Sequence, residues 1–270
     1  MSANRSAAAN IAQSLPVRQV PVARIADWLR LGWQDIRRAP GLSLLHGLIV
    51  TFFSIVIIQL TAFYWPILPG ALSGFVLVGP VLATGLYAIS RRLQDGEKPG
   101  LRDVFCAWRC ATGCLIRFNV LLVMAGTLWV LMSALLFNLF VTEEIDNPVD
   151  FLRYVLTQSE HLFLLWTLLG GLATALVFSI TVISVPLLLD RDIDMITAML
   201  TSIRVVGENP WTMTAWALVI MFATGLSFIS LMLGFVVLYP LLGHASWHLY
   251  RDLVDPASLP AREVEGLSGD

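Results

Sequence analysis

Three of the four histidines in this sequence fall near one end of its long apolar segments, where they could bind a metal ion. His244 and His248 are four residues apart, so both rings would lie on one face of a helix, and His46 could supply a third ligand. His161 falls at the opposite end. Histidines at a membrane interface more often bond to backbone or lipid head groups. We therefore keep His46, His244 and His248 as candidate ligands and assign no metal or haem.

The three cysteines are also spaced to share one helical face. Cys106, Cys110 and Cys114 follow one another at intervals of four residues. A structural zinc site needs four ligands, commonly arranged in CxxC pairs, and no further cysteine is present. An odd number of cysteines in one short segment also argues against a disulfide framework and indicates a reducing compartment. We interpret them as small apolar residues on the membrane-facing side of an interfacial helix.

A short acidic run is the third group that could hold a cation. It contains Asp190, Asp192 and Asp194, directly after an apolar segment and before an amphipathic one. Aspartates at that position cap the N-terminus of a helix and interact favourably with its dipole. N-capping is therefore the interpretation we favour for this run.

Charged side chains are absent from the interiors of the apolar segments. Ion pumps and proton-coupled carriers typically need such charges within the membrane. No Ser/His/Asp set, glycine-rich phosphate loop or pair of membrane carboxylates is visible, so the sequence predicts no catalytic residue and no cofactor-binding residue. The polar residues in these segments suit hydrogen bonds between helices; they include Gln59, Thr84, Asn119, Asn138 and Ser179.

The composition indicates a membrane protein. Hydrophobic residues make up 57% of the chain and charged residues 13%, whereas soluble domains carry about 45–50% and about 25%. The mean hydropathy is +0.77. Five apolar stretches exceed the ~18 residues that mark a spanning helix. Lys98 is the single lysine, and no basic face is evident, so nucleic acid is not an expected partner.

The apolar segments predict an all-α bundle of six transmembrane helices. The tract 211–250 is too long for one crossing, because 40 residues of helix would span roughly 60 Å and the hydrocarbon layer is about 30 Å thick. We predict two helices there, joined by a tight turn near Ser230 and Gly234. The predicted spans are 42–64, 67–90, 115–141, 162–189, 211–231 and 233–250.

The positive residues give the orientation of these spans. With six helices, every Lys and Arg except Arg153 lies on the side of the two termini. Positive residues accumulate in cytoplasmic loops, so both termini are predicted to be cytoplasmic. The loop with Arg153 is otherwise acidic. We expect a disordered cytoplasmic tail over 1–23, a transmembrane domain over 24–254 and a cytoplasmic tail over 255–270.

The sequence also contains a weak internal repeat. The segment FVLVGP at 75–80 resembles FVVLYP at 235–240, and a third copy centres on Pro186. Six helices would then form three hairpins, each preceded by an amphipathic interfacial helix. Pro80, Pro186 and Pro240 are predicted to kink or break their helices, because proline removes a backbone donor. The pairs Gly70 and Gly74, and Gly171 and Ala175, permit close packing of helices.

Five segments in order resemble the domain of unknown function 2189 family of bacterial membrane proteins. They are GPVLATGLYAISRR (79–92), GE (96–97), VPLLLDRD (185–192), NP (209–210) and PLLGHASWHLYR (240–251). The resemblance implies a multi-pass protein of the bacterial inner membrane. It implies no established activity.

These observations favour a non-enzymatic accessory, assembly or scaffold protein. The expected partners are the lipid bilayer and either another membrane protein or a second copy of this chain. One alternative is a channel or carrier for an uncharged or amphipathic solute, with its path lined by the proline-broken helices. A haem-binding or metal-binding redox protein is a third hypothesis.

Overall fold

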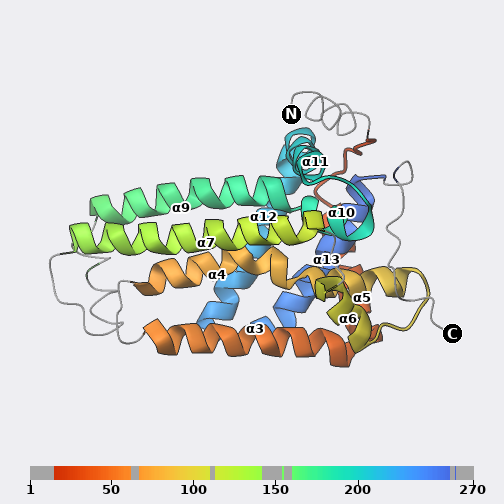
Figure 1. The fold of residues 1–270 in the computed structure, drawn as a ribbon, viewed down its shortest axis with the longest axis horizontal. Coiled ribbons are helices and arrows are strands. Elements are labelled where there is room, and N and C mark those ends of the chain that lie inside the picture. The colour runs from red at the N-terminus through yellow and green to blue at the C-terminus, as the bar shows by residue number, and fades with distance from the viewer. Residues whose placement is uncertain are drawn as a thin grey trace. The chain divides into compact units, whose positions relative to one another are not determined.

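A computed structural model describes residues 15–61, 67–109, 113–141, 154, 160–255 and 259. Within these ranges the chain is helical, with one isolated antiparallel bridge between Val17 and Val254 (Figure 1). The chain divides into two compact units. The first unit contains 1–51, 80–119 and 178–270, and the second contains 52–79 and 120–177. The predicted all-α fold class is confirmed.

The first third of the chain forms an amphipathic helix followed by two apolar helical segments. The amphipathic helix is α2 (Arg24–Arg38), which buries Ile25, Trp28 and Ile36 along one face. Pro40 begins the apolar α3 (Pro40–Thr61), a favoured position for proline because its missing N–H would have no partner there. The second apolar segment is divided into α4 (Leu68–Leu82) and α5 (Thr84–Gln94).

The middle of the chain repeats this order of elements. A short amphipathic helix, α6 (Leu101–Arg109), precedes the long α7 (Gly113–Phe140). A second long segment is again divided, into α9 (Glu160–Thr181) and α10 (Ser184–Asp190). Cys106 lies in α6 and Cys114 in α7, while Cys110 lies outside the described residues. The cysteines therefore do not share the face of one continuous described helix.

The last third shows the same order a third time. The amphipathic helix α11 (Met195–Glu208) begins at Asp194, whose carboxylate accepts a hydrogen bond of 3.0 Å from the Thr197 backbone N–H. N-capping is therefore confirmed for Asp194. The tract 211–250 is divided between α12 (Pro210–Ile229) and α13 (Phe235–Leu253). Its two helices are joined at residues 230–234.

The three prolines have different surroundings in these copies. Pro80 lies inside α4, which is interrupted at Ala83, and Pro186 lies in the first turn of α10. By contrast, α13 runs through Pro240 without a break. Proline frees the carbonyl four residues before it, here that of Val236. This carbonyl lies directly against Gly47 of α3, where the absence of a side chain leaves room for it.

Among the described residues, five helical segments are long and apolar enough to cross a membrane, as a helical membrane bundle requires. They are Pro40–Leu60, Leu68–Gln94, Gly113–Phe140, His161–Asp190 and Pro210–Ile229. The sixth predicted span falls on α13, which is not among them. Its C-terminal half carries His244, His248, Arg251 and Asp252, and these residues lower its hydropathy. The count of six spans stays a prediction.

In the first unit, α13 packs closely against three helices. A Cβ atom placed on Gly32 of α2 would lie 2.9 Å from the backbone N of Ala245 in α13. Gly47 brings α3 close to the backbone of Val236, and Gly243 of α13 faces Leu86 of α5. The small residues therefore allow α2, α3 and α5 to meet on α13.

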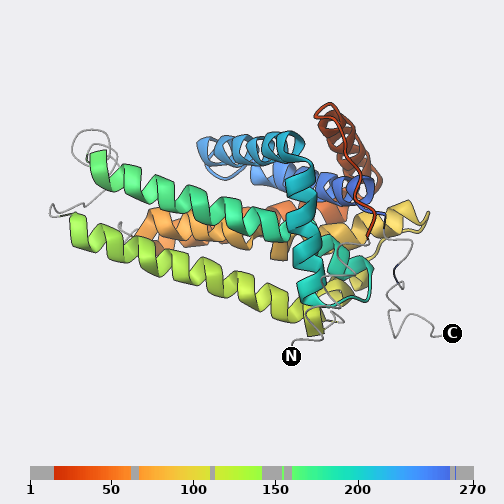
Figure 2. The same ribbon diagram turned by 90° about the horizontal axis from the view of Figure 1, so that it is seen from above.

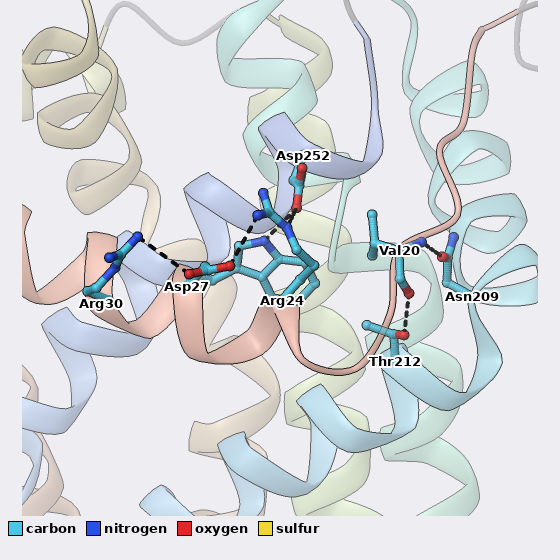
Figure 3. A network of polar contacts seen from close by, with 8 residues as sticks. Val20, Arg24, Asp27, Arg30, Asn209, Thr212 and Asp252 are labelled. Carbon is cyan, nitrogen blue, oxygen red and sulfur yellow. Dashed lines mark hydrogen bonds and ion pairs between the residues drawn. The ribbon is translucent and has the colours of Figure 1, made fainter.

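The N-terminal segment is attached to the ends of α12 and α13. Arg24 donates to a carboxylate oxygen of Asp252 at 2.8 Å (Figure 3). The Trp28 indole donates to the same oxygen at 3.0 Å. Burial raises the pKa of Asp252, but the hydrogen bonds from Arg24 and Trp28 and the nearby positive charge bring that pKa below its usual value. Upstream, Asn209 and Thr212 hold the backbone of Val20. Residues 15–22 thus differ from the expected disordered tail, and residues 1–14 lie outside the described residues.

In the second unit, tryptophans connect neighbouring helices by hydrogen bonds. The indole of Trp129 in α7 donates to Ser73 of α4, and that of Trp166 in α9 donates to Ser133 of α7, both at 2.7 Å. The helices α7 and α9 run side by side in both views (Figures 1 and 2). A buried indole N–H in hydrocarbon needs such a partner, because no water is available there.

The glycine pair at 70 and 74 packs α4 against α7. A Cβ on Gly70 would lie 2.8 Å from the Cβ of Ser133, the acceptor for Trp166. We expect Gly70→Ala to lower the free energy of unfolding by roughly 1–3 kcal/mol, because it overpacks this contact. A Cβ on Gly171 of α9 meets no atom within 4 Å. Gly171→Ala is the control and should stabilise by about 0.5–1 kcal/mol. Steric-trap unfolding in bicelles would measure both, and equal effects would contradict the packing assignment.

The turn between α12 and α13 contains two non-glycine residues with positive φ, Leu231 at 53° and Met232 at 70°. The N–H of Met232 bonds to the Ser227 carbonyl at 2.8 Å and that of Leu231 to Phe228 at 3.1 Å. This is the hydrogen-bond pattern of a Schellman motif, in which glycine normally occupies the position of Leu231. The turn therefore retains local strain.

Leu231→Gly should relieve that strain. The Leu231 side chain is 79% exposed, so the substitution removes little packing. We expect a gain of roughly 0.5–1 kcal/mol in the free energy of unfolding, measured as a rise in the melting temperature in detergent. Leu233→Gly is a matched control, because Leu233 is 63% exposed and has no positive φ. The control should destabilise, and a loss of stability in Leu231→Gly itself would refute the strain.

Candidate functional site

Five polar side chains from four helices of the first unit form one buried hydrogen-bonded network, the Asp35–His244 network. It consists of Asp35 of α2, Ser43 of α3, Ser90 of α5, and His244 and His248 of α13. Asp35, Ser43, Ser90 and His244 are all buried. Burying such groups is costly unless each of them is hydrogen-bonded. The network is therefore the strongest candidate for a functional site.

His244 is at the centre of the network. Its Nε2 lies 2.9 Å from the Ser43 hydroxyl, and its Nδ1 lies 2.7 Å from the Ser90 hydroxyl. Ser90 donates to the Asp35 carboxylate at 2.7 Å, and Ser43 donates to the Ala39 carbonyl at 2.9 Å. The same Asp35 oxygen lies 2.8 Å from Nε2 of His248. The chain of bonds thus runs from His248 through Asp35, Ser90 and His244 to Ser43.

The protons in this chain of hydrogen bonds can be counted, because each serine hydroxyl supplies one of them. Four bonds, from Ala39 through Ser43, His244 and Ser90 to Asp35, need four protons. The two hydroxyls and a neutral imidazole supply three. The fourth must be held by His244 or by Asp35, and it can pass between them through Ser90. All four bonds are therefore made only when the pair shares one extra proton.

This arrangement differs from a Ser-His-Asp catalytic triad. In a triad the histidine contacts the aspartate directly, and the serine hydroxyl is exposed to substrate. Here Ser90 lies between His244 and Asp35, and Ser43 is fully buried with its hydroxyl bonded to Ala39. A proton entering from His248 would reach only a backbone carbonyl at the far end. The network is suited to holding four helices together.

The structure brings two of the three candidate metal ligands into this network, but not as a ligand set. His244 has both ring nitrogens bonded to serines, and His248 contacts Asp35. His46 lies outside the network: its Nδ1 contacts the Leu42 carbonyl at 2.9 Å, and its Nε2 faces Gly85. His161 is exposed near the start of α9. Among the described residues, no group of three or more His, Cys, Asp or Glu could hold a metal ion.

Our sequence interpretation did not identify Asp35 and Ser90 as members of a site. One signal could have found Asp35. The buried positions of α2 include Ile25, Trp28 and Gly32, and Asp35 continues the same helical spacing. A carboxylate in the apolar register of an amphipathic helix needs a buried partner. Ser90 carries no such signal, because serine is common at the ends of membrane helices.

A comparison with known families agrees with the resemblance seen in the sequence. Residues 67–190 match the family described as "Predicted integral membrane protein (DUF2189)", which confirms the resemblance over that range. The matched range contains Ser90 but not Asp35, Ser43, His244 or His248. No curated protein and no solved structure is significantly similar to the chain. The chain is thus an integral membrane protein, and the match brings no activity with it.

Substitution of Asp35 tests whether the network stabilises the fold. Asp35→Ala leaves the Ser90 hydroxyl and His248 without their acceptor, so we expect a loss of roughly 2–3 kcal/mol in the free energy of unfolding. Asp27→Ala is the control on the same helix. The Asp27 side chain is 39% exposed and pairs with Arg24 and Arg30, so its loss should amount to less than about 1 kcal/mol. Similar losses in both variants, measured by thermal unfolding in detergent, would show that the network contributes no special stability.

Proposed function

We propose that this integral membrane protein is a non-enzymatic accessory, assembly or scaffold protein of the bacterial inner membrane. In this proposal it crosses the membrane six times and has both termini in the cytoplasm. The distribution of Lys and Arg, with Arg153 alone on the far side, supports that orientation.

The observation that carries the proposal is the position of His244. This residue is the buried side chain best suited to acid–base chemistry, and both of its ring nitrogens are bonded to serines of the protein. A general base must come within hydrogen-bond reach of a substrate proton. His244 instead joins α13 to α3 and α5, and through Ser90 to Asp35 of α2. Its chemistry is used in holding the fold together.

The packing around the helix interruptions gives less support to a carrier. In carriers, interrupted helices expose backbone groups to a solute path. Here Leu86, Ile183 and Leu187 near the two interruptions are fully buried. The N–H of Ile183 bonds to the Ser202 hydroxyl at 3.2 Å, and Thr84 donates to the Val81 carbonyl at 2.8 Å. These two polar groups at the interruptions are thus bonded within the protein.

Large apolar side chains on the long helices remain for contact with lipid or with a membrane partner. Exposed apolar side chains on membrane helices are expected in a bilayer, and some of them can serve for association. Conspicuous examples in the described residues are Phe52, Leu60, Leu128, Leu172, Trp211 and Phe222.

Photo-crosslinking in living cells tests the proposed accessory role. A photo-reactive phenylalanine derivative would replace Phe222 of α12 or, separately, Leu172 of α9, both exposed. We expect one of these positions to give reproducible crosslinks to one or a few membrane proteins, or to a second copy of this chain. The same derivative at exposed Leu60 of α3 and Leu128 of α7 is the control. A defined interface gives crosslinks at some of the four positions only, whereas random collisions give similar crosslinks at all of them.

A second measurement could overturn the proposal. The purified protein would be reconstituted into vesicles and supplied with a panel of uncharged and amphipathic solutes. Flux above that of protein-free vesicles, or turnover of a solute by the protein alone, would show that it is a carrier or an enzyme. Absence of both, together with position-specific crosslinks, supports an accessory protein.

A further inference from the structure

Three arginines converge on one buried aspartate in the first unit. Arg91 lies near the end of α5, Arg191 directly follows α10, and Arg251 lies near the end of α13. Each of these helices is the last of its copy of the threefold element order. The arginines therefore come from equivalent ends of the three copies, and they meet around Asp190. We call this group the arginine cluster.

The ion pairs of the arginine cluster all involve the Asp190 carboxylate, and Arg191 also donates to the Leu259 carbonyl at 3.3 Å. Its oxygens lie 3.2 Å from Nη1 of Arg251, 3.3 Å from Nε of Arg191 and 3.6 Å from Nε of Arg91. The Tyr250 hydroxyl donates to the same carboxylate at 2.8 Å. Arg91 also donates to the Leu189 carbonyl at 3.2 Å, which helps to fix its guanidinium. The carboxylate thus holds three guanidinium groups in one place.

The arginine cluster has more positive than negative charge. Among the described residues, Asp190 is the one carboxylate at ion-pair distance from these three guanidinium groups. Arginine stays protonated, so the cluster carries a surplus of two positive charges. The Nε atoms of Arg191 and Arg251 are buried and lack a hydrogen-bond partner within the described part of the chain. An anion at the exposed part of the guanidinium groups would stabilise this surplus positive charge.

The position of the cluster indicates which anions can reach it. Arg91 and Asp190 lie in the last turns of two candidate spans, Leu68–Gln94 and His161–Asp190. The ends of membrane spans lie at the level of the phospholipid head groups. The arginine side chains are 17–31% exposed, so an anion can approach part of each guanidinium. The planar donor fork of arginine matches the oxygens of a phosphate group.

We infer that Arg91, Arg191 and Arg251 form a binding site for a phosphate oxyanion. The phosphate belongs either to an anionic phospholipid head group or to free inorganic phosphate. This site goes beyond the proposed accessory role and does not depend on it, because a carrier or an enzyme could hold the same anion.

Binding measurements on the purified full-length protein test the site. Native mass spectrometry would count bound lipid after addition of phosphatidylglycerol or of zwitterionic phosphatidylcholine. Thermal unfolding in detergent would be measured with each lipid and with inorganic phosphate. We expect phosphatidylglycerol or inorganic phosphate to bind and to raise the melting temperature, and phosphatidylcholine to do neither. Stabilisation by phosphatidylglycerol alone identifies a lipid site, and stabilisation by inorganic phosphate identifies a site for the free anion.

Variants of the arginine cluster separate this site from a general attraction of positive charge. Arg91→Gln and Arg251→Gln should each weaken binding about tenfold, since each removes charge-assisted donors. Asp190 would keep two arginine partners in either variant, so the melting temperature without ligand should change little. Arg37→Gln and Arg38→Gln are the controls, because they remove the same charge from exposed positions of α2. The controls should leave the affinity within about twofold.

Asp190→Asn provides a readout that a purely structural role would not give. It removes the competing carboxylate and raises the surplus to three charges, so binding of the anion should strengthen. If this variant does not fold, the two single arginine variants still decide the question. The inference is overturned if neither phosphatidylglycerol nor inorganic phosphate binds better than phosphatidylcholine, or if the cluster variants behave like Arg37→Gln.

Discussion

The need to satisfy polar groups on α13 is the constraint on which the first unit depends. This helix carries His244, Tyr250 and Asp252 among apolar residues, and all three bond to side chains outside it. In a medium with little water, each unpaired group would cost several kcal/mol. The partners must come from other helices, because residues on α13 itself cannot supply them all. The polar groups of α13 therefore select its neighbours, and Gly32 and Gly47 let two of those neighbours come close.

The same order of elements recurs three times along the described helices, and α13 belongs to the third copy. Each copy has a short amphipathic helix, a long apolar helix and a second apolar segment that ends near an arginine. The copies are not equivalent in detail, since the second segment is interrupted in two of them and continuous through Pro240 in the third. The continuous helix is also the one that carries His244. A continuous helix keeps its side chains at fixed angular positions, so the polar groups of α13 can face α2, α3 and α5 at the same time.

Periodicity and composition were enough to predict the helices and their membrane character, because both depend on local sequence. The tight turn near Ser230 followed from the thickness of the bilayer. The side-chain network could not be predicted in the same way. Asp35 and His244 are 209 positions apart in the chain, yet Ser90 bonds to both of them. From hydropathy, His244 is predicted to lie at the membrane interface. The packing of α2 and α5 on α13 shows that it is buried. Asp190 was interpreted as a helix cap because its arginine partners Arg91 and Arg251 are distant in sequence.

The two polar groups of the first unit differ in whether their bonding is complete. In the Asp35–His244 network, donors and acceptors match once one extra proton is shared, so no further partner is needed. In the arginine cluster, three guanidinium groups share a single carboxylate within the described part of the chain, so their charges are not balanced. A closed network stabilises a fold, whereas an excess of one charge attracts a ligand of the other. The Asp35–His244 network is thus the group suited to a structural role, and the arginines that end the three copies are the group that we infer to bind an anion.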